Sequence, residues 1–100
     1  MKIHNEFAIV FRKVRRARGL TQEDFFDESG RTYISELERG LKHPTLVKID
    51  QLAGPLKLHP LTLLALSYTA NDDSMATLDN LMTQVRQEAE VIFKQKDNKQ

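Results

Sequence analysis

The sequence predicts an all-α protein in which five short helices are followed by a longer C-terminal amphipathic helix. Three observations support this prediction. Apolar residues recur at intervals of three and four along most of the chain, which is the spacing of one helix face. Glycine and proline mark the ends of most of these stretches. No segment shows the strict alternation of apolar and polar residues that is typical of a half-buried strand.

The composition fits one domain with an appendage, since the chain has 100 residues and 40% of them are hydrophobic. A chain of this length buries only about 60–65% of its unfolded surface, so oligomerisation would help it. The absence of cysteine excludes disulfides, thiolate zinc sites and cysteine nucleophiles, and it fits a reducing compartment. Neither a secretion signal nor a membrane span is visible, so we expect a soluble cytoplasmic protein without a membrane partner.

Charge is unevenly distributed although the net charge is only +1. Residues 1–70 hold 11 Lys and Arg against 8 Asp and Glu, whereas residues 71–100 hold 4 against 6. A basic front and an acidic back are compatible with a nucleic-acid-facing domain and a tail kept away from phosphate. Ordinary solubility charge explains the same counts equally well.

The first three helices are expected over residues 5–18, from Thr21 to Ser29, and over residues 31–39. Gly19 is a natural stop for the first helix. Thr21 with Asp24 three residues later resembles a capping box, and Ser29-Gly30 should break the second helix. The buried positions of these helices are expected to be Phe7, Val10, Phe11, Val14, Ala17, Phe25, Ile34 and Leu37.

The fourth and fifth helices are expected to begin at Thr45 and at His59-Pro60, where a cap and a first-turn proline are favourable. Gly54-Pro55 should disrupt the last turn of the fourth helix, because proline removes a backbone donor. The fifth helix is apolar on nearly every face, which is typical of a helix buried between layers or completed by another subunit.

The sixth helix is expected over residues 75–94, after the polar stretch Thr69–Ser74, and its end should fray. Its apolar residues are spaced 3, 4, 3, 4, 3, which gives a coiled-coil-like seam of nearly three heptads. This seam either joins two subunits or folds back over the fifth helix. We favour self-association, because a short lone helix is marginal without packing.

Residues 7–66 resemble the Cro/CI-like (Xre) helix-turn-helix domain of bacterial and phage regulators. The landmarks are Phe11, Val14 and Arg15, then Gly19-Leu-Thr-Gln22, Tyr33-Ile-Ser-Glu-Leu-Glu-Arg-Gly40, Pro44-Thr-Leu46 and His59-Pro60. The motif Arg31-Thr-Tyr-Ile-Ser35 is similar to the corresponding motif of small dimeric controller-type regulators. The resemblance implies a five-helix lambda-repressor-like DNA-binding domain over residues 1–69. From composition and apolar spacing we expect a linker over 70–74 and a C-terminal helix over 75–100 for dimerisation or docking.

Two departures from the family pattern concern geometry. The turn between the second and third helices is about two residues shorter than in most relatives, and Phe26 stands where a small residue is usual. The turn must therefore differ from that of most relatives, and the pose of the third helix does not follow directly from the resemblance. Lys57 replaces the glycine that commonly precedes the fifth helix, so we expect it to adopt a left-handed conformation at some cost.

The resemblance implies that the N-terminal residues of the third helix reach base edges in the major groove. Arg31 could bind guanine with two hydrogen bonds, and Thr32 could contact a thymine methyl. Glu36 could accept from cytosine, pair with Arg31 or simply be exposed. The residues assigned to DNA contact, by base or phosphate, are Thr21, Gln22, Arg31, Thr32, Tyr33, Ser35, Glu36, Arg39 and Lys42. For Lys48 an ordinary surface charge is the stronger interpretation.

Other positions receive architectural roles. Arg15 and Glu38 match positions that form a structural ion pair in relatives. The residues assigned to dimerisation are Leu63, Leu66, Met75, Leu78, Met82, Val85, Ala89 and Ile92. The three histidines are scattered, and no catalytic set or glycine-rich phosphate loop is present, so we expect no metal, cofactor, small-molecule ligand or enzymatic activity.

These observations favour a sequence-specific regulator that binds double-stranded DNA as a homodimer on a near-palindromic operator, as a repressor or by recruiting polymerase. One alternative is an antitoxin-like regulator that also binds a toxin partner. Another is a protein-interaction module that has lost DNA binding, which the shortened turn would favour.

Overall fold

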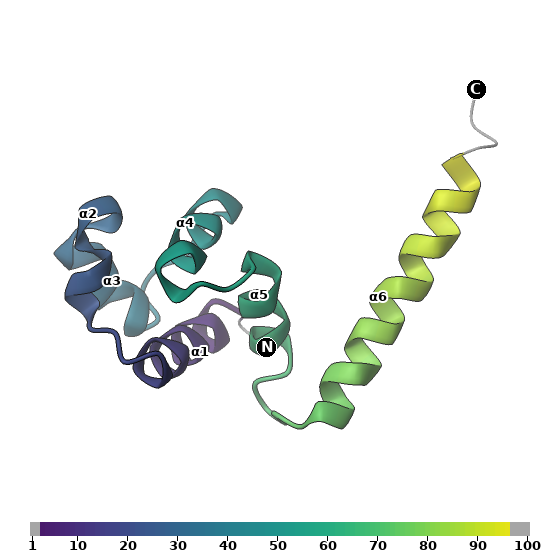
Figure 1. The fold of residues 1–100 in the computed structure, drawn as a ribbon, viewed down its shortest axis with the longest axis horizontal. Coiled ribbons are helices and arrows are strands. Elements are labelled where there is room, and N and C mark those ends of the chain that lie inside the picture. Colours follow the sequence, from purple (N-terminus) through teal and green to yellow (C-terminus); the bar gives the residue numbers. More distant parts are fainter. Residues whose placement is uncertain (1–2, 97–100) are drawn as a thin grey trace.

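The computed structural model describes residues 3–96, which form a small helical body and one long helix that projects from it (Figure 1). The body contains α1 (Ile3–Ala17), a 3-10 helix η1 (Gln22–Phe25), α2 (Phe26–Ser29), α3 (Arg31–Glu38), α4 (Leu46–Leu56) and α5 (Pro60–Tyr68). The projecting helix is α6 (Met75–Lys96). The described residues contain no strand, so the all-α prediction is confirmed. The sequence predicts fraying from Lys94 onward, but α6 continues to Lys96; the rest of this prediction, over residues 97–100, lies outside the described part.

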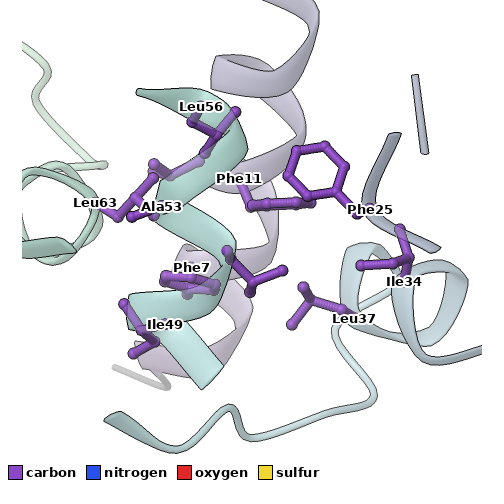
Figure 2. Close-up of a cluster of buried hydrophobic side chains, with 11 residues drawn as sticks. Phe7, Phe11, Phe25, Ile34, Leu37, Ile49, Ala53, Leu56 and Leu63 are labelled. Carbon is purple, nitrogen blue, oxygen red and sulfur yellow. The ribbon is translucent and has the colours of Figure 1, made fainter. Parts of the chain in front are cut away.

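The core forms where α1, α3, α4 and α5 meet (Figure 2). Phe11 is fully buried and packs edge-to-face on Phe25, with ring centroids 5.1 Å apart. Ile34 and Leu37 supply the buried edge of α3, as the sequence predicted. The remaining core positions come from the apolar faces of α1, α4 and α5. Because α3 enters the core through only one edge, its other faces remain available at the surface.

The predicted helix boundaries agree with the structure at several caps. The Thr45 hydroxyl accepts from the Lys48 amide at 3.1 Å. Nδ1 of His59 accepts from the Leu61 amide at 3.0 Å, so His59 begins α5 as expected. The hydroxyl of Ser74 accepts from the Thr77 amide at 3.1 Å and caps α6. Each of these bonds satisfies an amide that a helix start leaves without an intrahelical partner.

The second helix differs from its prediction. Instead of one α-helix from Thr21, the chain forms a 3-10 turn and then a four-residue α-helix. The Asp24 carboxylate accepts from both the amide and the hydroxyl of Thr21, at 2.8 and 3.2 Å, and this local ring holds the first turn tight. Gly30 alone separates α2 from α3, with φ 83° and ψ 156°, a conformation that is essentially restricted to glycine. The shortened turn is therefore a one-residue corner.

The C-terminal end of α4 also departs in part from expectation. The helix continues through Pro55 and ends only after Leu56, whose side chain is fully buried. Burial of Leu56 in the core outweighs the single backbone donor that Pro55 lacks. Lys57 then adopts the left-handed conformation that the resemblance implied, with φ 59°.

Candidate nucleic-acid interface

An ion pair between α1 and α3 fixes α3 to the rest of the body. Nε of Arg15 donates to Glu38 Oε2 at 2.6 Å and its Nη2 donates to Oε1 at 3.0 Å, which is the bidentate pair that the resemblance implied. Both side chains are buried. The hydrogen bond with Glu38 raises the pKa of the Arg15 guanidinium above its ordinary value, although burial acts in the opposite direction. A charged, doubly bonded pair of this kind sets both the distance and the rotation of α3 relative to α1.

Two more groups complete this connection. Nη1 of Arg15 donates to the backbone carbonyl of Leu20 at 2.8 Å, and the side-chain amide of Gln22 donates to Glu38 at 3.0 Å. The sequence predicts that Gln22 contacts phosphate, but one of its side-chain amide hydrogens is used in this hydrogen bond within the protein. Its second amide hydrogen remains available, because a primary amide has two donors. The start of η1 and the C-terminal end of α3 are held as one unit.

The outer face of α3 begins with two exposed residues, Arg31 and Thr32. The Arg31 guanidinium lies over the ring of Phe26, 5.5 Å from its centroid. Phe26, which stands where a small residue is usual, thus forms a cation–π contact with Arg31. It also limits the directions that the Arg31 side chain can take. The exposed Arg31 side chain next to Gly30 is therefore partly restrained by its contact with Phe26.

Glu36 pairs with Lys42 rather than with Arg31. The carboxylate lies 3.3 Å from Lys42 Nζ, and both side chains are partly exposed. Of the three roles considered for Glu36, the intrahelical pair with Arg31 is thus replaced by a pair with the following loop. Such exposed pairs are weak and can be rearranged by a competing anion. Ser35 is half-buried, and Arg39 is exposed where α3 ends.

Tyr33 lies between two lysines that sequence reasoning did not connect. Nζ of Lys48 is 4.9 Å from the centre of its ring and Nζ of Lys42 is 5.8 Å away. Lys48 also donates to the hydroxyl of Ser29 at 3.2 Å, so it bridges the end of α2 and the first turn of α3. Lys48 is therefore a brace across the one-residue corner as well as a surface charge. Its spacing in sequence gave no signal of this contact, because the corner had to be folded first.

Burial raises the pKa of the Tyr33 phenol above its ordinary value. A phenol is protonated at neutral pH even without this shift, so the hydroxyl can donate a hydrogen bond to a phosphate oxygen. Together with the exposed side chains of Arg39 and Thr21 and the half-buried side chain of Lys42, it contributes to a polar and basic surface around α3. Among the described residues no cluster of histidine, cysteine, aspartate and glutamate could hold a metal ion.

The residues assigned to dimerisation lie in two different surroundings. Leu63 requires a correction, because its side chain is fully buried in the core of its own subunit and is not available to a partner. Leu66, Leu78 and Met82 are half-buried where α5 and α6 meet, whereas Met75, Val85 and Ile92 are exposed. The sequence missed Leu61 and Tyr68, which lie seven residues apart and are exposed on α5. A spacing of seven residues places two side chains on one helix face. Because every face of α5 is apolar, this spacing did not indicate which face is exposed.

Comparison with known proteins agrees with the geometry. Residues 11–63 match the model of the helix-turn-helix family HTH_3. An uncharacterised HTH-type transcriptional regulator, y4dJ, of Sinorhizobium fredii (strain NBRC 101917 / NGR234) is 44% identical over 48 residues, which make up 46% of this chain and 62% of that protein. The matched region thus spans less than two thirds of the relative. No solved structure matches the chain. No helix among residues 3–96 is long and apolar enough to cross a bilayer.

Proposed function

Because the chain belongs to the Xre-type helix-turn-helix family of DNA-binding transcriptional regulators, we propose that it binds a specific double-stranded DNA sequence as a homodimer and regulates transcription there. The observation that carries this proposal is the outer face of α3. Arg31 and Thr32 are exposed at the N-terminal end of a helix whose opposite edge, Ile34 and Leu37, is fully buried. A helix anchored in this way can insert its first turn into a major groove.

The surroundings of α3 support the same docking. Lys42 and Arg39 follow the helix, and Thr21 lies at the start of η1. In the proposed complex they contact phosphates, together with Tyr33 and the free amide hydrogen of Gln22. Phosphate contacts fix register and orientation but carry no sequence information, whereas Arg31 reads a guanine and Thr32 a neighbouring base. Ser35 and Glu36, one turn further along α3, complete the proposed contact surface.

The position of α6 supports pairing of two such domains. Figure 1 shows α2 and α3 at one end of the molecule and α6 at the other, so contacts made through α5 and α6 leave α3 uncovered. In the proposed dimer the two copies of α3 enter successive major grooves about 34 Å apart and read a near-palindrome. Regulation then follows from the place at which the dimer is bound.

Two single substitutions test the docking. We expect Arg31→Ala to relax selectivity at one base position in each half-site, at a cost of about 1–3 kcal/mol for the preferred base. Lys42→Ala should weaken binding to all sequences alike and reduce the salt dependence by about one counterion. Selection from random DNA measures the first effect and titration across salt concentrations measures the second. If both variants retain the wild-type operator preference and salt slope, α3 does not dock in this way.

A further inference from the structure

The two halves of α6 have different surroundings. In its first half, Leu78, Leu81 and Met82 are half-buried and line the surface shared with α5. In its second half, Ile92 and Phe93 are 59% and 64% exposed. Figure 1 shows this half projecting away from the body. The part of the seam that lies beside α5 is therefore partly covered, whereas Met75 at its start and Ile92 near its end are exposed.

The first half of α6 and α5 enclose a long apolar groove. It consists of two adjoining hollows of about 340 and 250 Å³, which share Leu61, Ala65 and Met82. No lysine, arginine, aspartate or glutamate lines either hollow. On its rim, Leu61 and Tyr68 remain 49% and 59% exposed. A groove of this composition favours an apolar helix face as its occupant.

We infer that two copies of this chain pair by a reciprocal exchange. The second half of α6 of each copy fills the groove between α5 and α6 of its partner. The inference rests on the proposed homodimer and specifies how its subunits pair. The exchange is isologous and closed, because each copy supplies the same groove and the same helix half. It makes the two α6 helices antiparallel and places the two α5 helices outside them.

The register follows from the spacing of the seam. Val85 lies near the middle of α6, so a two-fold axis there places Ile92 of the second copy level with Leu78, and Ala89 of the second copy level with Leu81 and next to Met82. The small side chain of Ala89 then faces the larger side chains of Leu81 and Met82, which favours close packing. The second half of α6 is eleven residues, or about 16 Å, and the nine-residue α5 is about 14 Å long, so the two lengths match.

A parallel coiled coil fits the structure less well. It would bring the two first halves of α6 together, but Leu78 and Met82 already face the groove beside α5. The charges of the second half are compatible with the antiparallel exchange. Glu90 and Lys94 pair with each other at 3.3 Å, and helical spacing puts them on the side of α6 opposite to Ala89 and Ile92. This pair therefore lies outside the exchanged face.

The uncovered area is close to what a stable dimer needs. An aromatic side chain can bury roughly 150–250 Å², and a large aliphatic one somewhat less. Five exposed apolar side chains of α5 and α6 therefore offer on the order of 500 Å² per copy. They are Leu61, Tyr68, Val85, Ile92 and Phe93. The half-buried residues of the groove bring this total toward the about 800 Å² per partner of a standard interface. A second copy thus covers these exposed apolar groups of α5 and α6.

Engineered disulfides test the pairing directly, because the chain contains no cysteine. Thr62→Cys places a thiol in the groove and Ala89→Cys places one on the exchanged face. When the two single variants are unfolded together, refolded and mildly oxidised, we expect a disulfide that joins one chain of each kind. Ala89→Cys alone should not link to itself, since the two copies of residue 89 lie farther apart than the about 7 Å that a disulfide spans between Cα atoms. Val91→Cys replaces Ala89→Cys as the control and should not link to Thr62→Cys.

The mass in solution provides a second readout. Ile92→Asp puts a charge on the exchanged face, whereas Val91→Asp puts one on a similarly exposed residue outside it. We expect Ile92→Asp to weaken dimerisation at least tenfold and Val91→Asp to leave it unchanged.

Three results would overturn this pairing. The first is efficient self-linking of Ala89→Cys, which indicates a parallel coiled coil, and the second is equal dimerisation of both Asp variants. The third is a wild-type protein that stays monomeric, in which case the groove would bind a different protein. Base selectivity that depends on Arg31 would survive the first two results, so failure of the pairing is distinguishable from failure of the proposed function.

Discussion

Phe11 and Phe93 carry the same side chain in opposite surroundings. Phe11 is fully buried where α1 meets Phe25, whereas Phe93 is 64% exposed on the projecting half of α6. The body encloses an apolar core within one chain, although Ile9, Leu46 and Val47 stay exposed on its surface, whereas α6 leaves half of its seam in water. The contrast teaches that the body holds α3 in a fixed pose through a core of its own, whereas α6 keeps an apolar face that its own chain does not cover.

Substituting the two phenylalanines tests this contrast with the largest expected effect. Phe11→Ala should lower the free energy of unfolding by about 3–5 kcal/mol, because it removes a fully buried ring and leaves a cavity. Phe93→Ala should leave the stability of the monomer unchanged within about 0.5 kcal/mol. Urea unfolding at low protein concentration measures both. Comparable losses from the two substitutions would show that Phe93 is packed within its own chain.

The buried ion pair should show the next largest effect. Arg15→Met leaves the Glu38 carboxylate buried with Gln22 as its remaining partner, so we expect a loss of about 3 kcal/mol. Arg15→Met combined with Glu38→Leu should be less destabilising than Arg15→Met alone, because no charge is then stranded. Thermal unfolding of the two variants decides this. If the double variant is the less stable one, the pair contributes more than the cost of burying it.

Gly30→Ala should have a smaller effect on stability that also reaches function. At φ 83° and ψ 156° any side chain is strained, so we expect a loss of about 1–3 kcal/mol. Space is not the cause, because a Cβ atom at this position would meet no other atom within 4 Å. Since Gly30 is the entire corner before α3, operator affinity should fall more than in Gly54→Ala, whose glycine lies outside this corner. Equal affinities would show that the pose of α3 does not depend on the corner.

The smallest effect is expected at the junction of body and α6. Lys13 Nζ donates to the Asp73 carboxylate at 3.0 Å, and this hydrogen bond lowers the pKa of Asp73 below its ordinary value. Any stability from the pair is present above the ordinary pKa of an aspartate and is lost as the pH falls through the lowered pKa. Lys13→Ala should return the pKa of Asp73 toward its ordinary value, measured by NMR titration, without a detectable change in stability. A clear loss of stability would mean that the junction is rigid.

Local signals in the sequence predicted several helix starts in the body and in α6. Thr45, His59 and Ser74 begin helices because their side chains can accept from a free amide, which depends on only a few neighbouring residues. The burial of Ile34 and Leu37 follows from helical spacing alone. These features needed no knowledge of the tertiary fold.

The remaining features depend on contacts between distant residues. Leu63 was assigned to an interface because α5 is apolar on every face, and only packing against the core decided which face is inside. Lys48 was taken for an ordinary surface charge, but its contacts with Ser29 and Tyr33 exist only once α4 is placed beside the corner. The groove between α5 and α6 likewise requires both helices in position. Helical spacing marks a face as apolar but does not say what covers it.

Footprinting of the bound protein on DNA selected from random sequence tests the central claim most directly. The claim is that α3 reads a major groove in each half of a paired assembly. It predicts two protected half-sites on one side of the duplex, with centres about 10 base pairs apart, and inverted sequence similarity between them. Protection without sequence preference, or a single half-site protected at saturation, would contradict it.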